Sequence, residues 1–420
     1  MEVKNLDFFF SSNCNLSCKY CYLLNNKEKL QNYNNDLNNK IVNGSFFNNV
    51  KNSLKEKKID YLKIDSLSLW GAEPTLNSDN AELFLTQMFD YFENANSLFF
   101  STNATLGLEK ILPFINFTLN YKRKIEIRLQ ISIDGPEWIT KQNRGKVTDT
   151  IINTIIDLTK HLYDNKIDNV FIVLKPTLSM KQVALLSEDK DKLKDWYLFF
   201  ESLQDQIEQY NFNGKFNMIA SPTIANPEEY SVQDGKNLAL FLNNISKLDE
   251  KEFKYYKKNN LYIYNGDQVN RPMKEIQLCS AGRGSYGIDK DGYIYVCHRD
   301  FTYPIVNGID KNTDVTRYVK SESEFLQMDL KSTSFHNSIM SRYEFFKIVA
   351  IPMAKYGFID EKYLHNEEAL KVLFKCINNY VCSFGQIDYT KDLFIMYTGY
   401  LKLLGNGAVD ELLKFSVKRR

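Results

Sequence analysis

Three cysteines lie within eight residues near the start of the sequence, in the stretch NCNLSCKYCY, at Cys14, Cys18 and Cys21. The thiolate form of cysteine binds metals, so several thiols on one short loop indicate a metal centre. A closed tetrahedral site takes four protein ligands, but the next cysteine, Cys279, follows well over 200 residues later. Either one thiol is incidental, or one coordination position stays open.

Three interpretations of this loop can be compared. Incidental cysteines are usually small buried hydrophobic residues, which does not suit three of them in a loop rich in Asn and Ser. Structural zinc needs a fourth Cys or His nearby, and the surrounding sequence has none. An iron–sulfur cluster of the 4Fe–4S type has four irons that each take one outside ligand. Three thiolates therefore predict a cluster with one open iron.

Polar residues follow the next predicted strands. WGAEPTL places Gly71, Ala72 and Glu73 after one strand, and FFSTNATL places Asn103 after another. Glycine lets backbone approach closely, and a Glu carboxylate can accept hydrogen bonds from an ammonium group. The alternative is that both segments are ordinary strand exits and turns.

The stretch LQISIDGPEWITKQNRG carries three more polar residues. Ser132 and Asp134 alternate with Ile131 and Ile133, so hydroxyl and carboxylate are expected on one face, where they could bind a diol. Arg144 could bind a carboxylate through two parallel hydrogen bonds. The alternative is an Asp-Gly turn with a surface arginine.

The cysteine spacing, with Tyr20 directly before Cys21, resembles the signature of the radical S-adenosylmethionine (SAM) enzymes. The resemblance implies that the amino and carboxylate groups of SAM chelate the open iron of a 4Fe–4S cluster. It also implies reductive cleavage of SAM to a 5′-deoxyadenosyl radical, which takes a hydrogen atom from the substrate. A further set of residues would then contact SAM: Tyr20, Gly71, Ala72, Glu73, Asn103, Ser132, Asp134 and Arg144. Ala72 and Ala104 stand where this family usually has glycine.

Four later cysteines remain: Cys279, Cys297, Cys376 and Cys382. The segment from Cys279 to Cys297 resembles the start of the SPASM and twitch extensions, which bind auxiliary clusters in the same superfamily. A full SPASM module has seven cysteines, whereas four suffice to close one cluster. We expect one auxiliary 4Fe–4S cluster. Structural zinc and buried unpaired thiols are the alternatives.

The elements that must position these residues alternate between strand and helix. Apolar or β-branched runs predict strands at 6–10, 66–70, 97–101, 125–133, 169–175 and 215–220. Helical patterns lie at 30–57, 78–92, 106–117, 148–162, 181–208 and 232–248. This order predicts an α/β fold with a parallel sheet, and the resemblance implies a partial (β/α)6 barrel. Functional residues are expected at the carboxyl ends of its strands.

The domain organisation follows from a change of pattern near residue 265. We expect a radical SAM core over 1–255 and a small α+β auxiliary-cluster domain over 256–420. The second domain should begin with a hairpin, with strands at 286–288 and 293–296 and a DKDG turn. It should also contain a helical insert and a C-terminal helix.

Composition excludes several classes of protein. The 420 residues have a net charge of +1, which gives no basic field for nucleic acid. No apolar run is long enough to span a membrane, and no export signal is predicted. A cytoplasmic location is expected, where thiols stay reduced.

The expected substrate is a ribosomally made peptide or a protein side chain, because the SIDGP…R run is similar to the peptide-modifying branch. Sulfatase-maturating members usually carry all seven late cysteines, which weighs against that activity. Only thirteen residues precede Cys14, so leader recognition would need a separate leader-binding protein or the 300–370 region. A flavodoxin or ferredoxin would supply electrons. The alternatives are a dehydrogenase of a sugar or amino alcohol and a non-catalytic iron–sulfur protein.

Overall fold

The computed structural model describes residues 4–21, 23, 32–210, 216–218, 237, 240, 241, 244 and 285–295. Its strands form one sheet in the order β6-β5-β4-β3-β2-β1-β7-β8. Strands β1 to β7 are parallel to their neighbours, and β8 is antiparallel to β7. The strands are β1 (Asn5–Ser11), β2 (Ser66–Gly71), β3 (Ser97–Thr102), β4 (Glu126–Ser132), β5 (Val170–Lys175), β6 (Phe216–Met218), β7 (Ser285–Ile288) and β8 (Ile294–Tyr295).

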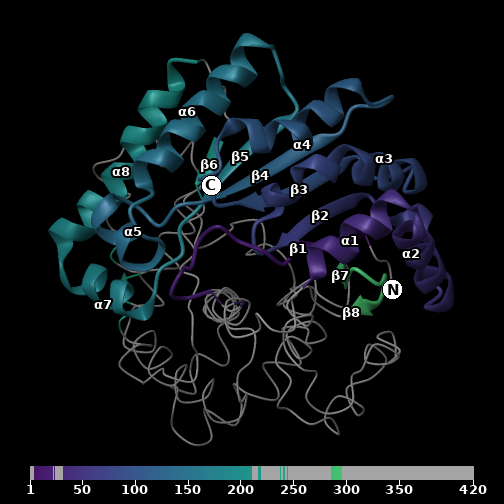
Figure 1. Ribbon diagram of the computed structural model, residues 1–420. Helices are drawn as coiled ribbons and strands as arrows, with labels where there is room; N and C mark the ends of the chain where they lie inside the picture. The colour runs from purple at the N-terminus through teal and green to yellow at the C-terminus, as the bar shows by residue number, and fades with distance from the viewer. Residues whose placement is uncertain are drawn as a thin grey trace, which may run out of the picture. The chain divides into compact units, whose positions relative to one another are not determined.

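Helices connect the parallel strands (Figure 1). They are α1 (Tyr33–Val42), α2 (Ser45–Glu56), α3 (Ala81–Tyr91), α4 (Leu108–Asn120), α5 (Glu137–Arg144), α6 (Thr148–Asp164), α7 (Met180–Glu188) and α8 (Lys190–Glu208). Two 3₁₀ helices, η3 (Tyr61–Lys63) and η4 (Pro74–Asn80), lie before and after β2.

Alternate residues of the central strands pack against the helices. The ring centroid of Phe8 on β1 lies 5.3 Å from that of Phe84 on α3. Phe10 lies 4.9 Å from the same ring, and Phe100 on β3 stacks on Phe114 of α4 at 4.8 Å. All five rings are buried, and such aromatic pairs add about 0.5–1.5 kcal/mol each to the gain from burial. This packing fixes the strands whose ends carry the polar residues.

The predicted α/β class is confirmed for the described residues. All six predicted parallel strands are present, within one residue at most ends. Whether the sheet curves into a partial barrel stays a prediction.

Three helix predictions differ from the structure. The helix predicted over 30–57 is two helices that break at Asn43 and Gly44, and the one over 181–208 breaks at Asp189. Helix α5 was not predicted, although it begins after Pro136 and ends before Gly145. Of the helix expected over 232–248, only residues 237, 240, 241 and 244 are described, and these are helical.

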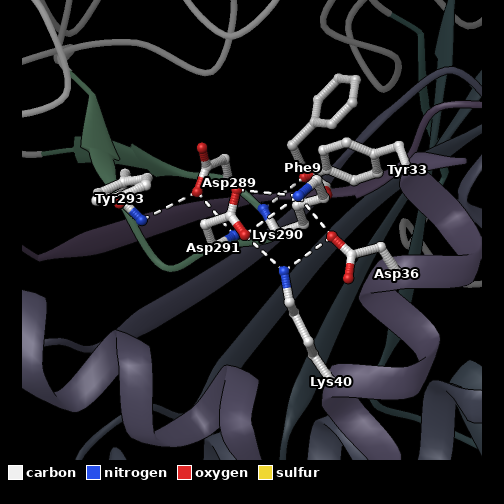
Figure 2. A network of polar contacts seen from close by, with 8 residues as sticks. All are labelled: Phe9, Tyr33, Asp36, Lys40, Asp289, Lys290, Asp291 and Tyr293. Atoms are coloured by element: carbon white, nitrogen blue, oxygen red, sulfur yellow. Dashed lines mark hydrogen bonds and ion pairs between the residues drawn. The ribbon is translucent and has the colours of Figure 1, made fainter. Parts of the chain in front are cut away.

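The predicted hairpin is confirmed as β7 and β8. Strand β7 extends the sheet of the core by pairing with β1, with Asn5 opposite Ser285. Its turn lies beside α1 (Figure 2), where the Lys290 backbone N–H donates to the Tyr33 hydroxyl at 2.7 Å. The Tyr33 hydroxyl donates in turn to the Phe9 carbonyl at 2.9 Å. The hairpin is thus part of the core sheet, although the sequence suggested a separate domain.

The described residues fall into two compact units. The first contains β1 to β8 and helices α1 to α6, and the second contains α7 and the start of α8. The predicted boundary at residue 255 lies outside the described residues and stays a prediction. Within the described part of the chain, no helix has the length and apolar character needed to cross a membrane.

Candidate functional site

Four loops that carry the predicted residues meet at one edge of the sheet. The cysteine loop follows β1, Glu73 follows β2, Asn103 follows β3 and Asp134 follows β4. Because these strands are parallel and adjacent, their carboxyl ends lie at the same edge. The sheet therefore brings the early motifs together as the sequence predicted.

The cysteine loop presents three free thiols. Cys14 is exposed, Cys21 is half-buried and Cys18 is buried. The turn from Cys18 to Cys21 is closed by the Cys21 backbone N–H, which donates to the Cys18 carbonyl at 2.9 Å. The Leu16 backbone N–H points at the Cys14 Sγ at 3.3 Å, so this sulfur already receives a donor from its own loop.

The thiols are close enough to influence one another electrostatically. Although Cys14 is exposed, desolvation of its thiol by the surrounding protein raises its pKa to about 11. The Leu16 N–H opposes this rise, and the negative charges of Glu73, Cys18 and Cys21 add to it. Burial also raises the pKa of Cys18, against the effect of the Arg144 charge. A positively charged metal centre would favour the thiolates that this environment otherwise disfavours.

The Gly71 turn holds the cysteine loop through backbone contacts. The Ala72 N–H donates to the Ser11 carbonyl at 2.8 Å, and the Glu73 N–H donates to the Asn13 carbonyl at 2.9 Å. Gly71 has a φ of +135°, and a Cβ there would collide with the backbone carbonyl of Ser11. Only glycine fits this close approach. Gly71 and Ala72 thus support the loop that carries Cys14.

The Glu73 carboxylate is buried and accepts four hydrogen bonds. Its Oε1 accepts from the Thr75 hydroxyl at 2.7 Å, the Thr75 N–H at 3.2 Å and the Thr102 hydroxyl at 2.7 Å. Its Oε2 accepts from the Asn103 N–H at 2.7 Å. Burial raises the pKa of Glu73, and these hydrogen bonds oppose the rise. The carboxylate links the loops that follow β2 and β3.

Asp134, Arg144 and Tyr20 form a second cluster, in which Asp134 and Arg144 are buried and Tyr20 is half-buried. The Arg144 Nε lies 2.9 Å from the Asp134 Oδ1, and the Tyr20 hydroxyl lies 2.9 Å and 2.8 Å from the two carboxylate oxygens. The Arg144 guanidinium also lies over the Tyr20 ring, 5.4 Å from its centroid. Burial alone would lower the pKa of Arg144, but the Asp134 charge raises it above its usual value. Ser132 is the last residue of β4 and is half-buried.

This cluster connects the cysteine loop to α5. The Lys19 backbone N–H donates to the Asn143 carbonyl at 3.0 Å, next to the Tyr20–Arg144 contact. Sequence patterns suggested Asp134 and Arg144 as direct ligands of a small molecule, whereas here they contact each other and Tyr20. Their contact with SAM stays untested.

Several partners were not predicted from the sequence: Asn15, Thr75, Thr102, Thr105 and Asn143. Each lies within two residues of a predicted site residue. Hydroxyl and amide residues within two positions of a predicted ligand are therefore the sequence signal that could have identified these partners.

The three thiols of the cysteine loop are a donor set that a 4Fe–4S cluster could use. In the described ranges, no group of three or more His, Cys, Asp or Glu side chains is placed to hold one metal ion. A 4Fe–4S cluster binds each thiolate through a different iron, so its ligands need not converge on one point. Three free, mutually interacting thiols on one loop suit that donor set. The predicted auxiliary ligands, Cys279, Cys297, Cys376 and Cys382, lie outside the described residues.

Comparisons with known proteins give limited likenesses. No known protein-family profile matches the sequence. An uncharacterized protein of Methanocaldococcus jannaschii is 30% identical over 194 residues, which are 44% of this chain and 57% of the relative. The chain thus spans little more than half the length of this curated relative. The chain is also similar to a solved structure described as native anSMEcpe with bound AdoMet, with a TM-score of 0.45, 16% identity, and coverage of 84% of this chain and 98% of that one. The same protein with bound AdoMet and a peptide gives a TM-score of 0.45 and 16% identity over 85% and 99% of the two chains.

Proposed function

We propose that the chain is a radical SAM enzyme. The observation that carries the proposal is the loop of three free thiols, Cys14, Cys18 and Cys21, at the sheet edge where Glu73, Asn103 and Asp134 also lie. Three thiolates leave one iron of a 4Fe–4S cluster for the amino and carboxylate groups of SAM. A cluster held there would donate one electron into the sulfonium C–S bond of SAM, which yields methionine and a 5′-deoxyadenosyl radical that abstracts hydrogen from the substrate.

The chain's own residues would position the cluster and SAM. Gly71 lets the backbone after β2 lie against Ser11, which places the Ala72 and Glu73 backbone beside the cysteine loop. Tyr20, Asp134 and Arg144 hold the other side of the loop through the buried Arg144–Asp134 pair and the part-buried Tyr20–Asp134 contacts. Fixed, buried partners of this kind lower the reorganisation needed during reaction. Ser132, at the end of β4, is assigned to the polar surface that receives SAM.

We further propose a peptide or protein side chain as the substrate. The proposal is supported by the SIDGP…R run, which is similar to the peptide-modifying branch of the radical SAM enzymes. Cys279, Cys297, Cys376 and Cys382 are assigned to one auxiliary 4Fe–4S cluster that exchanges electrons with the substrate radical or the first cluster. A flavodoxin or ferredoxin would be the electron donor, and a separate protein could bind a leader peptide.

The test is anaerobic reconstitution with iron and sulfide, followed by dithionite and SAM. We expect 5′-deoxyadenosine and methionine in equal amounts, as measured by chromatography with mass detection. The Cys14→Ala variant should yield neither, whereas Asn165→Ala, on the exposed end of α6, should match the wild type. Wild-type protein that carries iron and sulfide yet leaves SAM intact would contradict the proposal.

A further inference from the structure

The side chain of Asn103 is held in one orientation by a closed set of hydrogen bonds. Its Oδ1 accepts from the Thr105 backbone N–H at 2.9 Å and from the Thr105 hydroxyl at 2.6 Å. A backbone N–H can only donate, so the atom that faces it must be the amide oxygen. The amide nitrogen of Asn103 therefore points the other way.

The two protons of that nitrogen have separate acceptors. Nδ2 donates to the Asn15 Oδ1 at 2.9 Å, and it lies 3.6 Å from the Cys14 Sγ as a hydrogen-bond donor. The Asn15 amide completes the ring by donating to the Thr105 hydroxyl at 2.7 Å. Because the Asn15 Oδ1 takes one Nδ2 proton, the second Nδ2 proton is the one that faces the Cys14 sulfur.

The backbone of Asn103 is fixed as well. Its N–H donates to the buried Glu73 carboxylate at 2.7 Å, and Ala104, the next residue, has a φ of +56°. A left-handed alanine costs about 1–2 kcal/mol, and this turn brings the Thr105 N–H back to the Asn103 side chain. The position of the donor is thus set by Glu73 from one side and Thr105 from the other.

We propose that Asn103 is a positioning residue that raises the reduction potential of the centre bound by Cys14. This inference rests on the proposed function. Hydrogen bonds to ligand sulfurs help set the potentials of iron–sulfur clusters. A donor to a thiolate stabilises the more negative, reduced state, so Asn103 raises the reduction potential. Its role is to make the electron transfer into the centre easier, with no contact to the substrate required.

The experiment is a redox titration of the reconstituted full-length chain without SAM, followed by electron paramagnetic resonance. The relevant signal is the one absent from Cys14→Ala. In Asn103→Leu, which has similar volume and no donor, the ratio of reduced to oxidised centre at a fixed potential should fall about tenfold, or about 59 mV for one electron. Iron and sulfide per chain should stay unchanged.

Two further variants make the comparison specific. Asn13→Leu makes the same change in the cysteine loop, next to Cys14, where the Asn13 side chain accepts from the Ser12 hydroxyl at 3.4 Å. The potential of this variant should equal that of the wild type. Asn103→Asp keeps an acceptor for Thr105 and loses the donor, and it should lower the potential at least as far as Asn103→Leu.

Each other outcome overturns the inference. Equal potentials in wild type, Asn103→Leu and Asn103→Asp would overturn it while leaving the proposed function intact. Loss of the centre from both variants would show that Asn103 is needed for assembly, so a tuning role would be wrong. Wild-type chain that binds no centre would overturn the inference and the proposed function together.

Discussion

At the scale of residues, two buried carboxylates differ in the groups that offset their negative charge. Glu73 accepts hydrogen bonds from neutral hydroxyl and N–H donors, and burial raises its pKa. Asp134 faces the positive charge of Arg144, and both side chains are almost fully buried, at 0% and 6% exposure. A buried ion pair tolerates the loss of one partner poorly, because the other charge is left without compensation.

The Asp134→Asn variant should therefore be strongly destabilised. Removing one partner of a buried pair costs about 3–5 kcal/mol in the free energy of unfolding, measured by urea denaturation. The matched control is Asp168→Asn, which alters the exposed pair of Lys124 and Asp168, with side chains 67% and 69% exposed. Such a pair contributes about 0–1 kcal/mol. Similar losses in the two variants would contradict the assignment of a buried, coupled pair.

The types of the site residues could be predicted, but their partners could not. Three thiols at close spacing and polar residues at strand ends are visible in the sequence. The pairing of Tyr20 with Asp134 depends on where the cysteine loop runs after β1, which periodicity does not encode. Buried polar groups must be hydrogen-bonded, so residues proposed as ligands also became partners of one another.

At the scale of elements, the β7–β8 hairpin is fastened to α1 by a cluster of charges (Figure 2). Lys40 lies 2.8 Å from Asp36 and 2.5 Å from Asp291, and Lys290 lies 2.5 Å from Asp36. Each of the two lysine ammonium groups thus contacts both Asp36 on α1 and Asp291 in the hairpin turn. This cluster connects the helix after the cysteine loop to the segment that precedes Cys297.

Acid should loosen this attachment. Hydrogen bonds from Lys290 and Lys40 lower the pKa of Asp36; at Asp291 burial acts in the opposite direction, but the same lysines lower its pKa on balance. A lowered folded-state pKa adds stability above the unfolded value of about 3.9 that is lost as pH falls through the folded value. These side chains are 40% and 30% exposed, so the effect is expected to be below about 1 kcal/mol per pair.

Hydrogen exchange of the Lys290 amide, corrected for intrinsic rates, measures this effect. Protection should be constant from neutral pH down to about pH 4 and decline below it. In Asp36→Asn, protection at neutral pH should be lower and its decline in acid smaller. An identical acid decline in Asp36→Asn and wild type would exclude Asp36 as the titrating group.

Elements differed in how well the sequence predicted them. The strands were predicted well because buried runs of Phe, Leu and Ile stand out between polar segments. Helix α5 was missed because it has only eight residues, too few to show a clear helical period. The breaks at Gly44 and Asp189 fall inside continuous amphipathic patterns, where single residues decide the outcome.

At the scale of the whole molecule, every described site residue belongs to the first compact unit. Cys14, Glu73, Asn103, Asp134 and Arg144 are all positioned by strands β1 to β4 and helix α5. The same unit includes the β7–β8 hairpin, which carries the sequence towards Cys297. The proposed reacting centre would therefore lie at the sheet edge of this unit, with SAM as the proposed ligand of its open iron.

The most direct test of that assignment is electron–nuclear double resonance on the reduced, reconstituted chain with SAM labelled in its amino and carboxylate groups. The account predicts hyperfine coupling from both labels to the centre bound by Cys14, Cys18 and Cys21, and its loss in Cys18→Ala. A reduced centre whose spectrum is the same with and without labelled SAM would contradict the central claim.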